Sequence, residues 1–416
     1  MLVGKVPLFH PTSAQLLPWG ANFGPLTLGG QPWRLVTSVF LHIGIVHLLL
    51  NMWCLWNLGE LAEGLWKRTT LLAIFLLSGI AGAMFSLWWH PFVTVAGASG
   101  AIFGVAGALI SYFLSGHHPY SGRAAKVALV SLIVFAIYNL VFGFLTPGID
   151  NASHVGGFVV GLVLGLVLAR SRRQGHLLAA AAVVIVAVFV IQVRAMSYVV
   201  HLQRGRVALE LGQPDKAIAE LGLVIRQKPS LAEAQLLIGE SYLATAHFAQ
   251  AEAAFRRGLE LKPGNSQLMY RLGMSMLMQG RSAEALNLFQ EQARREPRNP
   301  EPLIGTGIAA ARQGDLVLAV GALRRAVQID PWSIEANYNL GVIALRAGLV
   351  DEALAAFARA AQLRPNDPAT ITKLGDAYKA KGMYAQAEAA YERARKLSPR
   401  SQDGPNPRAQ ETTSSR

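Results

Sequence analysis

The chain is poor in charge and in cysteine. Only 15% of its 416 residues are charged, well below the roughly 25% of a typical soluble domain. Its single cysteine, Cys54, excludes an internal disulfide framework and any metal site built from several thiolates. Acidic residues are rarest in residues 1–200, which contain only Glu60, Glu63 and Asp150. The rest of the chain, with 22 acids and 28 bases, has the charge content of an ordinary soluble domain.

Apolar segments of membrane length follow one another through the first half. A helix needs about 20 residues to cross the hydrocarbon core of a bilayer. The sequence predicts six spans, at about 44–64, 70–89, 98–115, 126–145, 153–169 and 176–193. We place the first five in a membrane domain over residues 35–175, and the sixth in an additional transmembrane helix over residues 176–197.

Basic residues fall at alternate connections between these spans. They are Lys67-Arg68, Arg123 with Lys126, and Arg170 with Arg172-Arg173. Positively charged loops stay in the cytoplasm, so the first span runs inward and the sixth ends outside. The sequence therefore predicts a multi-pass protein of the cell membrane, embedded in the lipid bilayer. The net charge of +13 does not indicate nucleic-acid binding, because the bases near the spans act as topology signals.

Four polar residues lie near the outer ends of the predicted spans: His47, Asn51, Ser99 and His154. Polar side chains inside a membrane bundle are costly and are usually functional. A serine hydroxyl within reach of an imidazole is the nucleophile–base arrangement of acyl transfer. We therefore expect Ser99 and His154 to form a catalytic dyad, with His154 oriented by stacking on Phe103. No triad is expected, since the nearest acid lies in an outer loop.

Glycines explain how the serine and the histidine could meet. Gly100 and Gly104 follow Ser99, and a longer stripe follows His154. That stripe contains Gly157, Gly161 and Gly165. Small residues at this spacing let membrane helices approach closely. If the two stripes face each other, the two polar side chains come level at the outer end.

An acyl-transfer site also needs donors for the oxyanion. The backbone N–H of Ser99 lies at a predicted helix N-terminus, and His47 and Asn51, four residues apart, share one helix face. A metal site built from His42, His47 and His154 is the alternative. We do not expect one, because the five-residue spacing of His42 and His47 points them to different helix faces and no carboxylate or thiolate joins them. No cofactor is expected either.

These residues resemble the rhomboid family over about residues 20–170. The matching motifs are GxSG at Gly97-Ala98-Ser99-Gly100, HxxxxHxxxN at His42, His47 and Asn51, HxxGxxxG at His154, Gly157 and Gly161, the outer-loop pair Trp33-Arg34, and Glu63. The resemblance implies an intramembrane serine endopeptidase that cleaves transmembrane-helix substrates near the outer membrane face. Its catalytic residues would be Ser99 and His154.

Residues 1–34 depart from that family pattern, because no apolar run long enough to cross precedes Trp33. Family members have a span there. We interpret residues 1–34 as the outer loop, left after a first span that lies upstream or that this form lacks. The second case favours the alternative function, a catalytically inactive membrane-anchored repeat scaffold or receptor.

A 34-residue period begins at Tyr198. It places glycine at 205, 239, 273, 307, 341 and 375, alanine at 217, 251, 285, 319, 353 and 387, and proline at 229, 263, 297, 331, 365 and 399. The pattern resembles the tetratricopeptide repeat. It predicts an α-solenoid of six repeats over residues 198–399, whose concave face binds a peptide or protein. The polar tail, residues 400–416, is predicted to be disordered.

The whole chain is therefore predicted to be all-α, with a rhomboid-like bundle followed by helix pairs. If the apolar run from Leu177 to Val193 crosses the membrane, the repeats lie outside, on the same side as Ser99.

Overall fold

The computed structural model describes residue 7 and residues 11–146, 148–171 and 173–397. The regular elements in these ranges are helices, which confirms the all-α prediction, and one isolated antiparallel β-bridge joins Asn22 to Val95. The predicted disordered tail, residues 400–416, lies outside the described residues, as do Arg172 and Pro399.

The chain divides into two units. The first comprises Met1–Val207 with Arg226–Lys228, and the second comprises Ala208–Ile225 with Pro229–Arg416. This division falls within α10 (Ser197–Glu210), so most of that helix belongs to the first unit. The domain boundaries near residues 34, 175 and 197 stay predictions.

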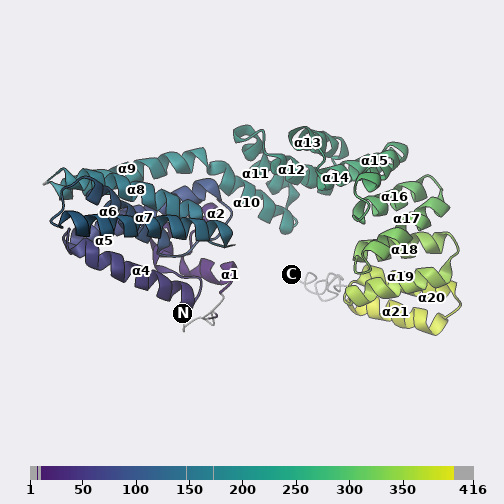
Figure 1. Ribbon diagram of the computed structural model, residues 1–416. Coiled ribbons are helices and arrows are strands. Elements are labelled where there is room, and N and C mark those ends of the chain that lie inside the picture. The colour runs from purple at the N-terminus through teal and green to yellow at the C-terminus, as the bar shows by residue number, and fades with distance from the viewer. Residues whose placement is uncertain (1–6, 8–10, 147, 172, 398–416) are drawn as a thin grey trace, which may run out of the picture. The chain divides into compact units, whose positions relative to one another are not determined.

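The described part of the first unit holds a bundle of six apolar helices (Figure 1). They are α4 (Ile45–Glu63), α5 (Arg68–Trp89), α6 (Ser99–Leu114), α7 (Gly122–Leu145), α8 (Asn151–Ala169) and α9 (Gln174–Ala195). Each predicted span corresponds to one of these helices within a few residues. All but α6 are long and apolar enough to cross a membrane. The chain is therefore a multi-pass membrane protein.

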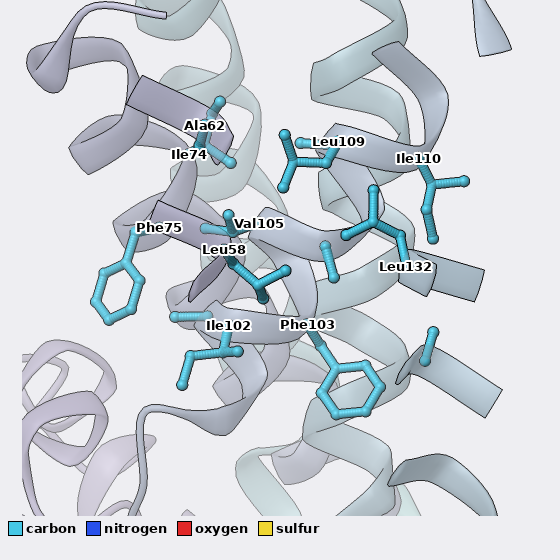
Figure 2. Close-up of a cluster of buried hydrophobic side chains, with 14 of the residues drawn as sticks. Leu58, Ala62, Ile74, Phe75, Ile102, Phe103, Val105, Leu109, Ile110 and Leu132 are labelled. Atoms are coloured by element: carbon cyan, nitrogen blue, oxygen red, sulfur yellow. The ribbon is translucent and has the colours of Figure 1, made fainter. Parts of the chain in front are cut away.

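Helix α6 is the buried centre of this bundle. It is buried continuously from Gly100 to Ser111. Figure 2 shows its aliphatic and aromatic side chains among those of neighbouring helices. The labelled residues are Ile102, Phe103, Val105, Leu109 and Ile110 of α6, Leu58 and Ala62 of α4, Ile74 and Phe75 of α5, and Leu132 of α7. A helix of 16 residues is about 24 Å long. Because other helices surround it, α6 does not have to reach both headgroup layers itself.

The outer surface of the bundle is apolar. Large exposed side chains include Leu49, Trp53, Val134, Val183 and Ile191. An exposed apolar surface of this extent would be unfavourable in water but is the normal face of a membrane bundle toward lipid.

The two glycine stripes of α6 and α8 face each other. A Cβ atom added at Gly157 would lie 2.0 Å from the carbonyl oxygen of Gly100, and one added at Gly161 would lie 1.9 Å from that of Gly104. These are contacts of backbone against backbone, which only glycine allows. They bring the N-terminal ends of the two helices together.

The repeats form pairs of antiparallel helices (Figure 1). After α10, they comprise α11 (Pro214–Gln227), α12 (Ala232–Ala244), α13 (Phe248–Leu261), α14 (Ser266–Met278), α15 (Ser282–Arg295), α16 (Glu301–Arg312), α17 (Leu316–Ile329), α18 (Ile334–Arg346), α19 (Val350–Leu363), α20 (Pro368–Ala380) and α21 (Tyr384–Leu397). The periodic aromatic residues Phe255, Phe289 and Phe357 are fully buried. Phe289 lies close to Gly273 in its own repeat and to Gly305 in the next, so it joins the two repeats.

Candidate functional site

Ser99 is the first residue of α6, two residues after Gly97, whose backbone conformation favours glycine. Gly97 has φ +151°, and a Cβ atom there would lie 2.8 Å from Cε1 of His47. The Gly97 N–H donates to the carbonyl oxygen of Ser38 in the short helix α3 (Arg34–Phe40), which follows the outer loop, at 2.9 Å. This hydrogen bond fixes the position of the backbone that leads into Ser99. The absence of a side chain at residue 97 makes room for the His47 ring.

The structure brings Ser99 and His154 together. Ser99 Oγ lies 2.8 Å from His154 Nε2, although 55 residues separate them. The His154 ring stacks on Phe103, with ring centroids 4.5 Å apart and an interplanar angle of 10°. His154 is 6% exposed, and its Nδ1 has no hydrogen-bond partner among the described residues. The imidazole thus stacks on Phe103, and its Nδ1 is hydrogen-bonded to no carboxylate among the described residues.

Asp150, the acid nearest to His154 in sequence, caps α8. Its Oδ1 accepts a hydrogen bond from the Ser153 N–H at 3.2 Å. A carboxylate at this position stabilises the helix N-terminus. Burial raises the pKa of the Asp150 carboxyl, although its hydrogen bonds act in the opposite direction.

A third helix, α5, packs against α6 and α8, the two helices that carry Ser99 and His154. No sequence motif indicated this role of α5. Helix α5 contributes Gly82, where a Cβ atom would lie 2.6 Å from the carbonyl oxygen of Ser153. It also contributes Ser78, whose Cβ lies 2.0 Å from the position of a Cβ on Gly104. Small residues of α5 lie in a long apolar run, so nothing in the sequence marks which of them face α8. Helices α5, α6 and α8 thus converge around Ser99 and His154.

Asn51 lies one turn after His47 on α4 and is buried. Its Nδ2 is a buried donor that has no hydrogen-bond partner among the described residues. The His42 and His47 rings lie edge to face, with centroids 5.3 Å apart. The expectation that their spacing separates them is wrong, because His42 precedes α4, which begins at Ile45. No group of three His, Cys, Asp or Glu residues suited to a metal ion occurs in the described part of the chain.

The outer loop is held together by Arg34, which is 5% exposed. Its Nη1 donates to the carbonyl oxygens of Leu17 and Ala21, at 2.7 and 2.9 Å, and its guanidinium lies over the Trp33 ring, 4.7 Å from the centroid. Trp33 is itself 47% exposed. The pair thus shapes the loop.

Asn22, which no sequence motif marks, is fully buried within that loop. Its Nδ2 donates to the carbonyl oxygen of Ala83 on α5, at 3.1 Å, and its backbone pairs with Val95. A loop asparagine has no sequence signal of its own, since this role depends on which backbone groups the fold brings within its reach.

Comparison with known proteins identifies both parts of the chain. Residues 29–171 match the rhomboid domain family. Residues 202–266, 236–300, 270–333 and 332–400 match tetratricopeptide repeat families. The chain thus contains a rhomboid domain and tetratricopeptide repeats, as the motifs predicted.

Several curated relatives of the chain are rhomboid proteins. Rhomboid protease GluP of Bacillus subtilis is 40% identical over 146 residues, which are 35% of this chain and 28% of the relative. RHOMBOID-like protein 7 of Arabidopsis thaliana is 37% identical over 39% of this chain and 51% of the relative. Rhomboid protease AarA of Providencia stuartii is 33% identical over 37% of this chain and 62% of the relative. The chain thus spans between about a quarter and three fifths of the length of these relatives.

Solved structures resemble the repeats. The type IV pilus biogenesis factor PilW is 23% identical, covers 48% of this chain and 92% of its own, and has a TM-score of 0.42. A tetratricopeptide protein of Thermus thermophilus is 22% identical over 41% of this chain and 93% of its own, with a TM-score of 0.38.

Proposed function

We propose that this chain, which joins a rhomboid domain to tetratricopeptide repeats, is an intramembrane serine endopeptidase. The observation that carries the proposal is the 2.8 Å separation of Ser99 Oγ and His154 Nε2 at the adjoining N-termini of α6 and α8. The similarity to proteins named rhomboid proteases supports the same reaction. The substrates are transmembrane helices, cleaved near the outer membrane face.

In the proposed mechanism, Ser99 Oγ attacks the scissile carbonyl carbon while its proton passes to His154 Nε2. The tetrahedral intermediate collapses when His154 returns that proton to the leaving amine, which leaves an ester on Ser99. Water, deprotonated by His154, then attacks the ester carbonyl carbon. When this second intermediate collapses, the bond from the acyl carbon to Ser99 Oγ breaks, His154 returns the proton to Oγ, and the new carboxyl terminus leaves. Stacking on Phe103 keeps Nε2 directed at the serine throughout.

The oxyanion would be stabilised by three donors: the backbone N–H of Ser99, the Asn51 amide and the His47 ring. Three observations support this assignment. Ser99 opens its helix, where backbone N–H groups have no partner within the helix. Asn51 Nδ2 is a buried donor with no partner among the described residues. His47 packs against the backbone at Gly97, two residues before the nucleophile. Preorganised donors of this kind are typically the largest electrostatic contribution to acyl transfer.

The repeats would bind a protein or peptide on the side of the membrane where Ser99 lies. Helix α9 has 22 residues with a mean hydropathy of 2.6, enough to cross. Near its C-terminal end, the Gln192 amide donates to the carbonyl oxygen of Met84, at 2.8 Å, close to the end of α5. That end of α5 adjoins the outer loop through Asn22. These contacts support a full crossing, after which the repeats could present the exposed parts of substrates to the site.

The test of the reaction uses the full chain reconstituted in liposomes with a model transmembrane substrate. We expect the wild type to cleave and to be labelled by a fluorophosphonate on Ser99, while Ser99→Ala and His154→Ala do neither. Ser121→Ala, an exposed serine whose side chain makes no capping bond at the start of α7, is the matched control. A folded wild type that neither cleaves nor is labelled would favour the inactive scaffold.

The test of the orientation is protease protection in cells stripped of any outer membrane or wall. We expect added protease to degrade a tag placed after residue 397 without opening the inner membrane. A tag that stays protected until that membrane is opened would put the repeats in the cytoplasm.

A further inference from the structure

A hydrophobic cluster joins the first repeat helix to the end of the bundle that carries Ser99. Its buried members are Leu28 of the outer loop, Leu35 of α3, Ala83, Met84 and Leu87 of α5, Met196 just before α10, and Val199 in its first turn. Val199 is fully buried, and Phe189 and Val193 of α9 pack against the same cluster. The start of α10 is therefore packed as part of the protease unit, consistent with a division between units that falls only at Val207.

Two polar contacts extend this packing along the chain. The Arg206 guanidinium lies over the Phe92 ring, with Cζ 5.7 Å from the centroid. The side-chain amide of Gln192, near the end of α9, donates a hydrogen bond to the carbonyl oxygen of Met84. Phe92 lies in the segment between α5 and α6 that leads to Ser99. Helix α10 therefore contacts this segment through Arg206, and it contacts the outer loop through the cluster that contains Val199 and Leu28.

That segment depends on the outer loop for its position. The N–H groups of Asn22 and Val95 each donate to the other residue's carbonyl oxygen, at 2.9 Å. The Gly24 N–H donates to the Pro91 carbonyl oxygen and the Gly97 N–H to that of Ser38, both at 2.9 Å. A displacement of the loop or of Phe92 therefore moves Gly97, and with it the N-terminus of α6.

We propose that the segment Met196–Arg206 of the first repeat is a positioning element of the protease. Through Val199 and Arg206 it holds the outer loop and Phe92 in the arrangement that sets Ser99 against His154. The inference rests on the proposed function and adds to it a role for a repeat helix other than ligand binding. Loosening this contact would lower the rate of the chemical step, because small displacements of a nucleophile reduce turnover steeply.

The experiment measures kcat and KM for a transmembrane substrate, and the rate of fluorophosphonate labelling of Ser99, in the reconstituted full chain. We expect Val199→Ala and Arg206→Ala each to lower kcat and the labelling rate about tenfold, with KM little changed. Val199→Ile, which keeps the apolar contact but is one methylene larger, should lower kcat less than Val199→Ala does. Arg204→Ala, an exposed arginine on the same helix, is the control that should change nothing.

A double-mutant cycle tests whether the arginine acts through the phenylalanine. If it does, Phe92→Ala combined with Arg206→Ala will lower kcat no further than the worse single variant. Additive losses in kcat would show that Arg206 does not act through Phe92 and would overturn its assigned role.

The outcomes separate this inference from the proposed function. A wild type that does not cleave overturns the proposed function, and the inference falls with it. A wild type that cleaves, together with folded Val199→Ala and Arg206→Ala variants of unchanged kcat, overturns the positioning role alone. Variants that raise KM at constant kcat would also overturn it, since they would show that α10 acts in substrate binding.

Discussion

The two halves of the chain both place glycine where helices cross, but the glycines meet different groups. In the membrane half, the atoms nearest to a Cβ on Gly157, Gly161 or Gly165 include carbonyl oxygens of α6 at about 2 Å. In the repeats, a Cβ on Gly239, Gly273 or Gly341 would meet a phenylalanine ring at 2.4 to 2.7 Å. A backbone cannot move without moving its helix, whereas a side chain can adjust its rotamer or shift.

This difference follows from the two solvents. Lipid supplies no hydrophobic force between apolar helices, so membrane helices gain stability by close backbone packing over small residues. In water, burial of a large aromatic ring contributes much more to stability, and each repeat glycine leaves space for such a ring. The same residue type therefore makes the membrane contact rigid and the repeat contact adaptable.

The largest effect is expected for Gly161→Ala. Its methyl group would lie 1.9 Å from the Gly104 carbonyl oxygen, so α6 and α8 must separate. A displacement of about 1 Å between nucleophile and base can cost about a hundredfold in turnover. Cleavage and fluorophosphonate labelling should both fall by about that factor.

The matched control for that variant is Val163→Ala, two residues along on an exposed face of α8. It should leave the rate of cleavage unchanged. Wild-type turnover by folded Gly161→Ala would show that the helices can separate without disturbing the dyad, and would remove the contrast between the halves.

A smaller effect is expected for Gly341→Ala in the repeats. The methyl group would lie 2.7 Å from Cδ1 of Phe357, a fully buried ring that has to shift. Overpacking of this kind costs about 1–3 kcal/mol. Hydrogen–deuterium exchange of α18 and α19 in the full chain would measure this loss of stability. The rate of Ser99 labelling should stay at the wild-type value. Complete loss of protection throughout the repeats would show that this contact is no more adaptable than the membrane one.

The contrast also marks what the sequence could and could not predict. The length of the apolar runs predicted the membrane helices, and the 34-residue period predicted the repeats. Glycine spacing led to the expectation that α6 and α8 could face each other, because close helix packing depends on a regular pattern. Spacing failed for His42, since a residue just before a helix does not obey helical periodicity. It also missed Gly82, Asn22 and the packing of Val199, since these contacts depend on which segments the complete fold brings together.

The repeats also use charge between units, as Glu252 illustrates. Its carboxylate accepts hydrogen bonds from Arg256 within α13 and from Gln279 and Arg281 of the next repeat, at 2.7 to 3.0 Å. Burial acts to raise the pKa of Glu252, but these hydrogen bonds outweigh it, so the pKa is lowered. A carboxyl whose pKa is lower in the folded state contributes stability above its unfolded pKa and loses it as the pH falls.

Glu252→Gln should therefore destabilise the repeats at pH 7 by about 1.5 kcal/mol, the lower end of the range for hydrogen bonds to charged groups. The difference from wild type should shrink as the pH falls below the ordinary range of glutamate. Hydrogen exchange of α13–α15 at several pH values measures this difference in the free energy of unfolding. A difference that is constant down to acid pH would show that the charge of Glu252 contributes nothing. Glu260→Gln, at an exposed ion pair with Arg257, is the control, because such pairs contribute little.

The smallest effect, and one of opposite sign, is expected for Gly321→Ala on α17. A Cβ atom there would have nothing within 4 Å, whereas one on Gly307, in the same repeat, would lie 2.5 Å from Cγ of Leu323. With no contact to disturb, only helix propensity remains, and alanine exceeds glycine by about 1 kcal/mol in a helix interior. Gly321→Ala should thus raise the protection of α16 and α17 against hydrogen exchange, and Gly307→Ala should lower it. If both variants were destabilising to a similar degree, the effect of a repeat glycine would not depend on what it faces, and the explanation of both halves by contact partner would fail.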